Sequence, residues 1–204
     1  MNEKFTWREA WQEKNFRIQL IISFCILICI VVFVPRFFEF IQQRNGPVLN
    51  DPVLRLLTSH DLSFFTFFLI YSSALVALIS FLFYPHILLY SLQSYCLLIT
   101  LRMLCIWLVP LNEPPSMIML NDPLIELIGY RGEIITKDLF FSGHTSTLLL
   151  FFFAAPNRSL KVFFLLTSVS VAVCVLIQHV HYTVDVLAAP LFSWISYRIC
   201  FRKR

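Results

Sequence analysis

The feature that most constrains this chain is a series of six long apolar runs separated by polar segments. A helix that crosses a bilayer needs about 20 mostly apolar residues, within a usual range of about 17–25. Lipid offers no hydrogen-bond partners, so each run must pair its own backbone groups as a helix. The pattern predicts an all-α, polytopic membrane protein with six transmembrane helices in one bundle, over residues 18–38, 62–84, 87–109, 140–155, 160–178 and 183–199.

The composition excludes an ordinary water-soluble domain. Of the 204 residues, 58% are hydrophobic and only 14% are charged, whereas about a quarter of a typical soluble domain is charged. Polar residues are therefore too few to cover a water-facing surface. The formal net charge of +4 is modest and the basic residues form no stripe, so we expect a membrane and no nucleic acid as the partner.

The length suits one membrane domain, residues 18–199, between an N-terminal cytoplasmic segment, residues 1–17, and a basic cytoplasmic tail, residues 200–204. The first segment mixes aromatic and charged residues. This mixture is typical of an interfacial helix on the inner membrane face. A loosely ordered tail fits the same residues equally well.

The basic residues predict the orientation in the membrane. Ten of the sixteen Lys and Arg lie on the two ends and the two short connections. Because short cytoplasmic segments carry an excess of Lys and Arg, we expect both termini in the cytoplasm. The two long connections, residues 39–61 and 110–139, then face the outer or lumenal side.

Two polar clusters interrupt the apolar pattern at the predicted outer ends of helices. Polar groups in a membrane helix are costly, so each cluster indicates function. His144 and His181 are 37 residues apart, which is enough for one helix down and one helix back. We therefore predict that the clusters meet at one mouth of the bundle; they consist of Asp138, Ser142, Gly143, His144 and Thr145, and of His179, His181, Tyr182, Thr183 and Asp185.

Three of these residues form a pattern suited to covalent catalysis. His181 and Asp185 are spaced i, i+4 and share one helical face. A carboxylate against one ring nitrogen holds the tautomer and leaves the other nitrogen free to attack. His144, from another helix, could protonate a leaving oxygen. We predict His144, His181 and Asp185 as the catalytic residues.

The remaining residues suit an anionic ligand. Ser142 and the backbone at Gly143 precede a helix, where N–H groups and the helix dipole favour phosphate. Gly143 stands where the backbone could approach a ligand closely, and Arg102, inside the third helix, can grip phosphate with two donors. We predict phosphate or substrate binding by Ser142, Gly143, Thr145, Arg102, Asp138, His179 and Tyr182.

Structural explanations compete with these roles. Asp185 could simply cap its helix, and Arg102 could extend to the headgroups. A zinc site is the other alternative, but His179 and His181 would point about 200° apart on a helix and no H-E-x-x-H pattern occurs. We expect neither a metal nor another cofactor.

Both clusters resemble motifs of the sphingomyelin synthase family, within the type-2 phosphatidic acid phosphatase superfamily. Residues 138–145 resemble its D-x-x-x-S-G-H-T motif, and residues 179–185 resemble its H-x-H-Y-T-x-D motif. Arg102, followed by Leu111 and Pro114, is similar to its third-helix R…L-P-x-P pattern. The resemblance implies six helices, a lumenal or extracellular site, and a triad carried over to His144, His181 and Asp185.

The chain also departs from the family. Thr136-Lys137 replaces the usual Cys-Gly before the aspartate, and Cys174-Val175 occupies the positions of the Ser-Arg pair of ordinary phosphatases. The second departure favours the synthase-like branch. The first, with the absence of an extra N-terminal domain, leaves the acceptor and the head group open.

The resemblance implies an integral-membrane lipid phosphotransferase. It would move a phospho-head group from a phospholipid donor to a lipid alcohol (ceramide or diacylglycerol) or to water, through a histidine-linked intermediate. A lipid phosphate phosphatase with water as its only acceptor remains an alternative. A non-enzymatic membrane transporter or lipid-binding protein is another, although transporters usually place polar groups near the midplane. The sequence also leaves open a homo-oligomer.

Overall fold

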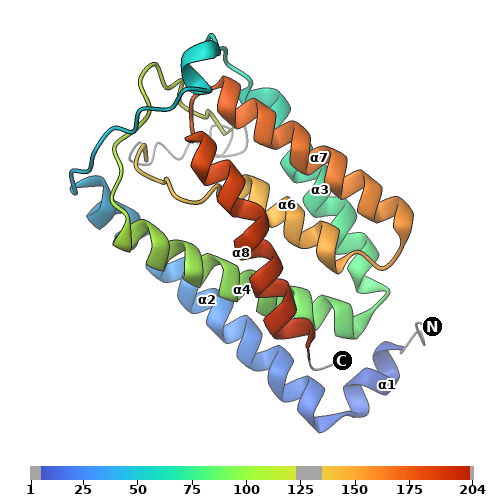
Figure 1. Ribbon diagram of the computed structural model, residues 1–204. Coiled ribbons are helices and arrows are strands. Elements are labelled where there is room, and N and C mark those ends of the chain that lie inside the picture. The colour runs from blue at the N-terminus through green and yellow to red at the C-terminus, as the bar shows by residue number, and fades with distance from the viewer. Residues whose placement is uncertain (1–5, 123–134, 203–204) are drawn as a thin grey trace.

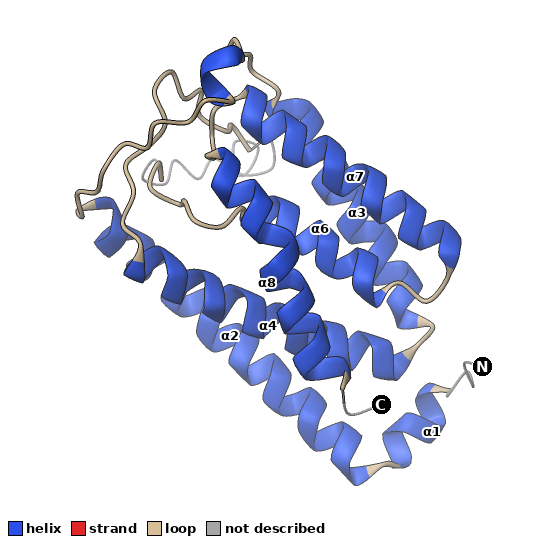
Figure 2. Cartoon of the chain, viewed as in Figure 1, coloured by secondary structure: helices blue, strands red, loops and turns tan. Residues whose placement is uncertain are grey.

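The computed structural model describes residues 6–122 and 135–202, and every regular element within these residues is a helix (Figure 2). Five helices are long and apolar enough to cross a membrane, which confirms an all-α polytopic membrane protein. The elements are α1 (Trp7–Gln12), α2 (Lys14–Gln42), the 3-10 turn η1 (Leu54–Leu56), α3 (Ser63–Leu82), α4 (Pro85–Leu108), α6 (Gly143–Ala154), α7 (Arg158–Ile177) and α8 (Thr183–Phe201).

The predicted fourth span is the short helix α6, which has 12 residues. At 1.5 Å per residue it is about 18 Å long, whereas the hydrocarbon core of a bilayer is about 30 Å thick. The predicted count of six spans is therefore not confirmed. The apolar run begins earlier, but Ser142 caps the helix: its Oγ accepts the Thr145 N–H at 3.4 Å. The two phenylalanines before Ser142 therefore stay outside the helix.

Helix α6 lies at the centre of the bundle and packs on α3, α4, α7 and α8 (Figure 1). Its Leu148 and Leu150 are almost completely buried. Because neighbouring helices surround α6, its first turn can place polar groups inside the protein. Helix α2, by contrast, packs mainly on α4 and leaves most of its apolar surface exposed.

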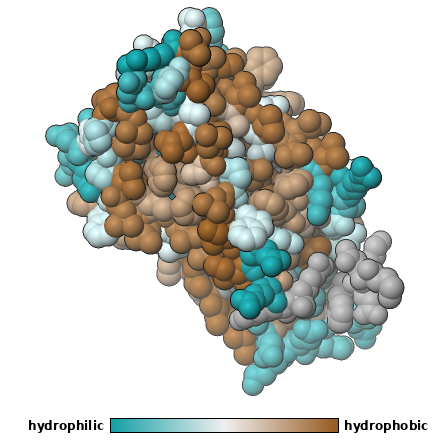
Figure 3. Space-filling model, in the orientation of Figure 1, coloured by the Kyte–Doolittle hydropathy of each residue, from teal (hydrophilic) through white to brown (hydrophobic). Residues whose placement is uncertain are grey.

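The described parts of the two long connections lie together at one end of the bundle, and the end of α8 lies toward the other end (Figure 1). The visible surface is mostly apolar between polar patches at its ends (Figure 3). That the long connections share one membrane side, and which side this is, both stay predictions.

The N-terminal residues 7–12 form helix α1, which begins with a capping box between Thr6 and Glu9. The Trp7 indole N–H donates to the Leu82 carbonyl at 2.6 Å, and Ala10 is buried. Helix α1 therefore packs against the turn between α3 and α4. A position in the membrane interface stays a prediction for this segment. Residues 1–5 of the segment, and residues 203–204 of the predicted basic tail, lie outside the described residues.

Helix α2 is longer than the predicted span, since it begins at Lys14 and ends at Gln42. Pro35 lies inside it. A proline removes one backbone hydrogen bond and can kink a helix without ending it. The polar residues on both sides of the apolar run therefore extend the same helix beyond residues 18–38.

Candidate active site

The structure brings the two polar clusters together inside the bundle. His144 lies in the first turn of α6 and His181 lies just before α8. Their ring centroids are 6.4 Å apart, with the ring planes at 63°. The Nδ1 atom of His181 lies 3.4 Å from Oδ2 of Asp185, and both side chains are at most 1% exposed. The three predicted catalytic residues thus lie together, with His181 and Asp185 buried and His144 half-buried.

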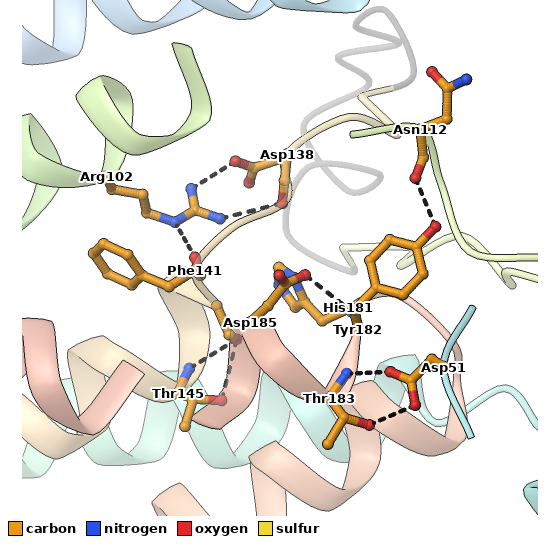
Figure 4. A network of polar contacts seen from close by, with 11 residues as sticks. Asp51, Arg102, Asn112, Asp138, Phe141, Thr145, His181, Tyr182, Thr183 and Asp185 are labelled. Carbon is orange, nitrogen blue, oxygen red and sulfur yellow. Dashed lines mark hydrogen bonds and ion pairs between the residues drawn. The ribbon is translucent and has the colours of Figure 1, made fainter. Parts of the chain in front are cut away.

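Asp185 has two partners besides the imidazole of His181 (Figure 4). Its Oδ2 accepts the Tyr182 N–H at 3.0 Å, so it also caps the start of α8. Its backbone carbonyl accepts the Ser142 N–H at 3.1 Å. This second bond joins the N-cap of α6 to the first turn of α8. Capping and contact with His181 are therefore compatible roles of one carboxylate.

Arg102 of α4 holds the segment that leads into α6 (Figure 4). Its Nη1 lies 2.6 Å from Oδ1 of Asp138. Its Nε donates to the Phe141 carbonyl at 2.9 Å, and its Nη2 donates to the Asp138 carbonyl at 3.3 Å. The guanidinium is thus turned into the protein and does not extend to the headgroups.

Gly143 leaves room for the Arg102 guanidinium. A Cβ atom at position 143 would lie 2.8 Å from both Cζ and Nε of Arg102, which is closer than carbon atoms can pack. From the sequence, we expect a ligand to approach the backbone closely in this space. In the structure, the arginine side chain is the group that makes the close approach.

A cavity of about 600 Å³ lies between α2, α3, α4 and α6. This volume is within the range of small-molecule sites. Apart from its polar end the lining is mainly apolar, and it continues along α3 and α6 as far as Phe81 and Phe151. The polar end is formed by Arg102, Asp138, Gly143 and His144.

Two aromatic residues of α3, which the motifs did not predict, complete the surroundings of His144. Phe67 contacts His144 edge to face, with centroids 6.1 Å apart, and it stacks on Tyr71. Tyr71 lines the cavity, and its hydroxyl donates to the carboxylate of Asp122 at 2.6 Å. Both residues lie in an ordinary apolar run, so nothing in the sequence indicated that they lie near His144.

Four of the predicted substrate-binding residues do not line this cavity. Ser142 and Thr145 are buried and bond to each other through their hydroxyls at 3.1 Å. The Tyr182 hydroxyl accepts the Leu49 N–H and donates to the Asn112 carbonyl. These contacts join the loops to the helices.

His179, the fourth of these residues, lies in another place. Its Nδ1 is 3.1 Å from the Pro115 carbonyl oxygen. It lines a separate cavity of about 430 Å³ between the long connections. Among residues 6–122 and 135–202, no three His, Cys, Asp or Glu side chains lie where they could hold a metal ion together.

Residues 137–201 match the family model described as PAP2 superfamily C-terminal. The matched segment contains α6, α7 and α8 and therefore His144, His181 and Asp185. No curated protein and no solved structure matches the chain. The family match supports a relationship to the type-2 phosphatidic acid phosphatase superfamily and, in general terms, a function of the lipid phosphatase or phosphotransferase type.

Proposed function

With this superfamily match as the premise, we propose that the chain is an integral-membrane lipid phosphotransferase that works through a covalent bond to His181. The observation that carries the proposal is the position of His144 at the polar end of an apolar cavity, with His181 and Asp185 next to it. A lipid phosphate has the same division into a polar head and an apolar chain.

The two ends of the cavity suit the two parts of a lipid substrate, its apolar chain and its phosphate. Apolar side chains line most of it, and burying a methylene group is worth about 0.8 kcal/mol. At the polar end, the positive end of the α6 dipole and the Arg102 guanidinium favour phosphate oxygens. The phosphoryl group would then lie beside His144 while the lipid chain lies between α3 and α4.

In the first half-reaction, Nε2 of His181 attacks the phosphorus and a P–N bond forms. The bond between phosphorus and the alcohol oxygen of the donor lipid breaks, and His144 gives its proton to that oxygen. Asp185 faces Nδ1 of His181 at 3.4 Å. It holds the tautomer in which Nε2 has the free lone pair.

In the second half-reaction, the hydroxyl of the acceptor gives its proton to the same His144. The acceptor oxygen attacks the phosphorus, the P–N bond breaks and His181 is restored. A lipid alcohol such as ceramide or diacylglycerol would yield a new phospholipid, whereas water would yield a free phosphorylated head group. Both outcomes need the same three side chains.

Within this function, the motifs support a sphingomyelin synthase-like reaction. Residues 138–145 and 179–185 resemble the two histidine motifs of that family, and Cys174-Val175 replaces the Ser-Arg pair of ordinary phosphatases. The basic residues of the termini support a site on the outer or lumenal side. A phosphatase that uses only water is the alternative.

The test is a lipid-product screen with purified protein in detergent. Phospholipids labelled in the head group are supplied with ceramide, with diacylglycerol, or with no lipid acceptor. We expect labelled new phospholipid in at least one acceptor arm, and its loss in His144→Ala. Free labelled head group in every arm would favour the phosphatase. Lipid binding without any turnover would favour a transporter or lipid-binding protein.

A further inference from the structure

Asp51, in the connection between α2 and α3, reaches the first residue of α8 (Figure 4). Its Oδ2 accepts the Thr183 N–H at 2.6 Å, and its Oδ1 accepts the Thr183 hydroxyl at 3.0 Å. Oδ1 also accepts the N–H groups of Val53 at 2.9 Å and Leu54 at 3.2 Å. One carboxylate thus receives two bonds from its own loop and two from a residue that is 132 positions away.

The start of α8 needs this external acceptor. The first N–H groups of a helix have no partner inside it. Tyr182 occupies the N-cap position, but no side-chain cap bond comes from it, because its hydroxyl bonds to Leu49 and Asn112. Asp185 accepts the Tyr182 N–H and faces His181 with the same oxygen. Asp51 supplies the acceptor for Thr183 that the helix itself does not provide.

We propose that Asp51 is a positioning residue of the site: by capping α8 from another loop, it keeps the Asp185 carboxylate against His181. This inference rests on the proposed function. Without Asp51, the Thr183 N–H would lose its acceptor, and Asp185 carries the next carboxylate in that turn. A rotation of Asp185 toward Thr183 would take Oδ2 away from His181.

The loop that carries Asp51 is itself held in place. The Asn112 N–H donates to the Pro47 carbonyl at 3.2 Å, and the Leu49 N–H donates to the Tyr182 hydroxyl at 3.1 Å. The carboxylate is therefore fixed with respect to the residue that follows His181. A residue that positions a catalytic group needs such support to hold its geometry.

The variant Asp51→Asn tests the inter-segment bond. The amide oxygen can still accept from Val53 and Leu54, but an NH₂ group in the place of Oδ2 cannot accept the Thr183 N–H. The matched control is Asp61→Asn. Asp61 accepts the N–H of Ser63 at 2.9 Å and its hydroxyl at 2.7 Å at the start of α3, both through Oδ1, so an amide at this position removes a loop charge and keeps both bonds.

The kinetic readout separates positioning from the general effect of removing a loop charge. We expect Asp51→Asn to lower kcat about 10–100-fold, which is the usual cost of losing a hydrogen bond that supports a functional side chain. KM should change by less than about twofold, because Asp51 does not contact the substrate. Asp61→Asn, which keeps its bonds through Oδ1, should leave both thermal stability and kcat near the wild-type values. An equal loss of kcat in both variants would overturn the positioning role, as would an unchanged kcat in Asp51→Asn.

A second readout does not depend on turnover. In protein labelled with ¹⁵N in its imidazole rings, the Nδ1–H of His181 should give a slowly exchanging proton signal in the wild type and in Asp61→Asn, and no such signal in Asp51→Asn. A signal that survives in Asp51→Asn, or is missing from the wild type, overturns the proposal. If Asp51→Asn loses the signal but the wild-type protein forms no lipid product, the positioning role is supported and the proposed function is contradicted.

Discussion

His144 and His181 lie with their ring centroids 6.4 Å apart, although they belong to different segments and each ring has a different second neighbour. The second neighbour of His144 is the apolar ring of Phe67, and His144 lines the cavity. That of His181 is the carboxylate of Asp185. This asymmetry supports a proton-transfer role for His144 and a nucleophilic role for His181.

The first prediction concerns proton transfer by His144. His144→Gln should slow turnover of a natural phospholipid by about 10²–10⁴-fold, the usual contribution of a general acid. A nitrophenyl ester, whose leaving group needs no proton, should lose much less. The values of kcat/KM for the two donors, which report the first half-reaction alone, give the comparison, with Phe67→Leu as the control for the ring contact. An equal loss with both substrates would contradict the role.

The second prediction concerns the contact between Gly143 and Arg102. In Gly143→Ala, the new Cβ would meet the guanidinium at 2.8 Å and displace it from Asp138, so turnover should fall. In Arg102→Lys the guanidinium that binds Asp138 and the Phe141 carbonyl is already absent. Adding Gly143→Ala to this variant should lower turnover little further. A double-mutant cycle on kcat/KM should show a coupling of about 0.5–3 kcal/mol. Additive losses would count against the contact.

The third prediction concerns the lipid chain in the cavity. Ala74 of α3 lines the cavity and its neighbour Leu75 does not. Ala74→Phe should fill space that a lipid chain occupies, so KM should rise for long-chain phospholipids and stay unchanged for a water-soluble short-chain analogue. Leu75→Phe places the same ring at an exposed neighbouring position and should change neither KM. Equal effects of Ala74→Phe on both substrates would argue against a chain-binding cavity.

The fourth prediction concerns pH. Burial raises the pKa of Asp51, but bonds from Thr183, Leu54 and Val53 outweigh burial and hold the pKa below its ordinary value. A carboxylate with a lowered pKa in the folded state stabilises the fold above its unfolded pKa of about 3.9, and this contribution is lost as the pH falls through the folded value. The difference in thermal stability between wild type and Asp51→Asn should therefore be largest near neutral pH. Below about pH 4 it should shrink, and a constant difference would contradict the account.

Much of the fold followed from local patterns. Each apolar run is long enough to be read as a helix, and the spacing of His144 and His181 implied one helix down and one back. Their convergence needed no knowledge of side-chain packing. The length of α6 was harder to predict, because hydropathy does not show that Ser142 caps the helix after the apolar run has begun.

The remaining features depend on contacts between distant segments. Asp51 looks like an ordinary loop residue, since the bond to Thr183 crosses 132 positions. Gly143 was expected to make room for a ligand, and only the packed structure shows that Arg102 fills that space. The loop contacts of Tyr182 and His179 could not be read from the motif that contains both residues.

The central claim is covalent catalysis by His181, and trapping of the intermediate tests it most directly. Purified protein is mixed with a phospholipid labelled at phosphorus, quenched before the first turnover is complete and digested for mass spectrometry. The account predicts an acid-labile, base-stable label on His181 in the wild type and none in His181→Ala. A His181→Ala protein that still carries the label would contradict the account.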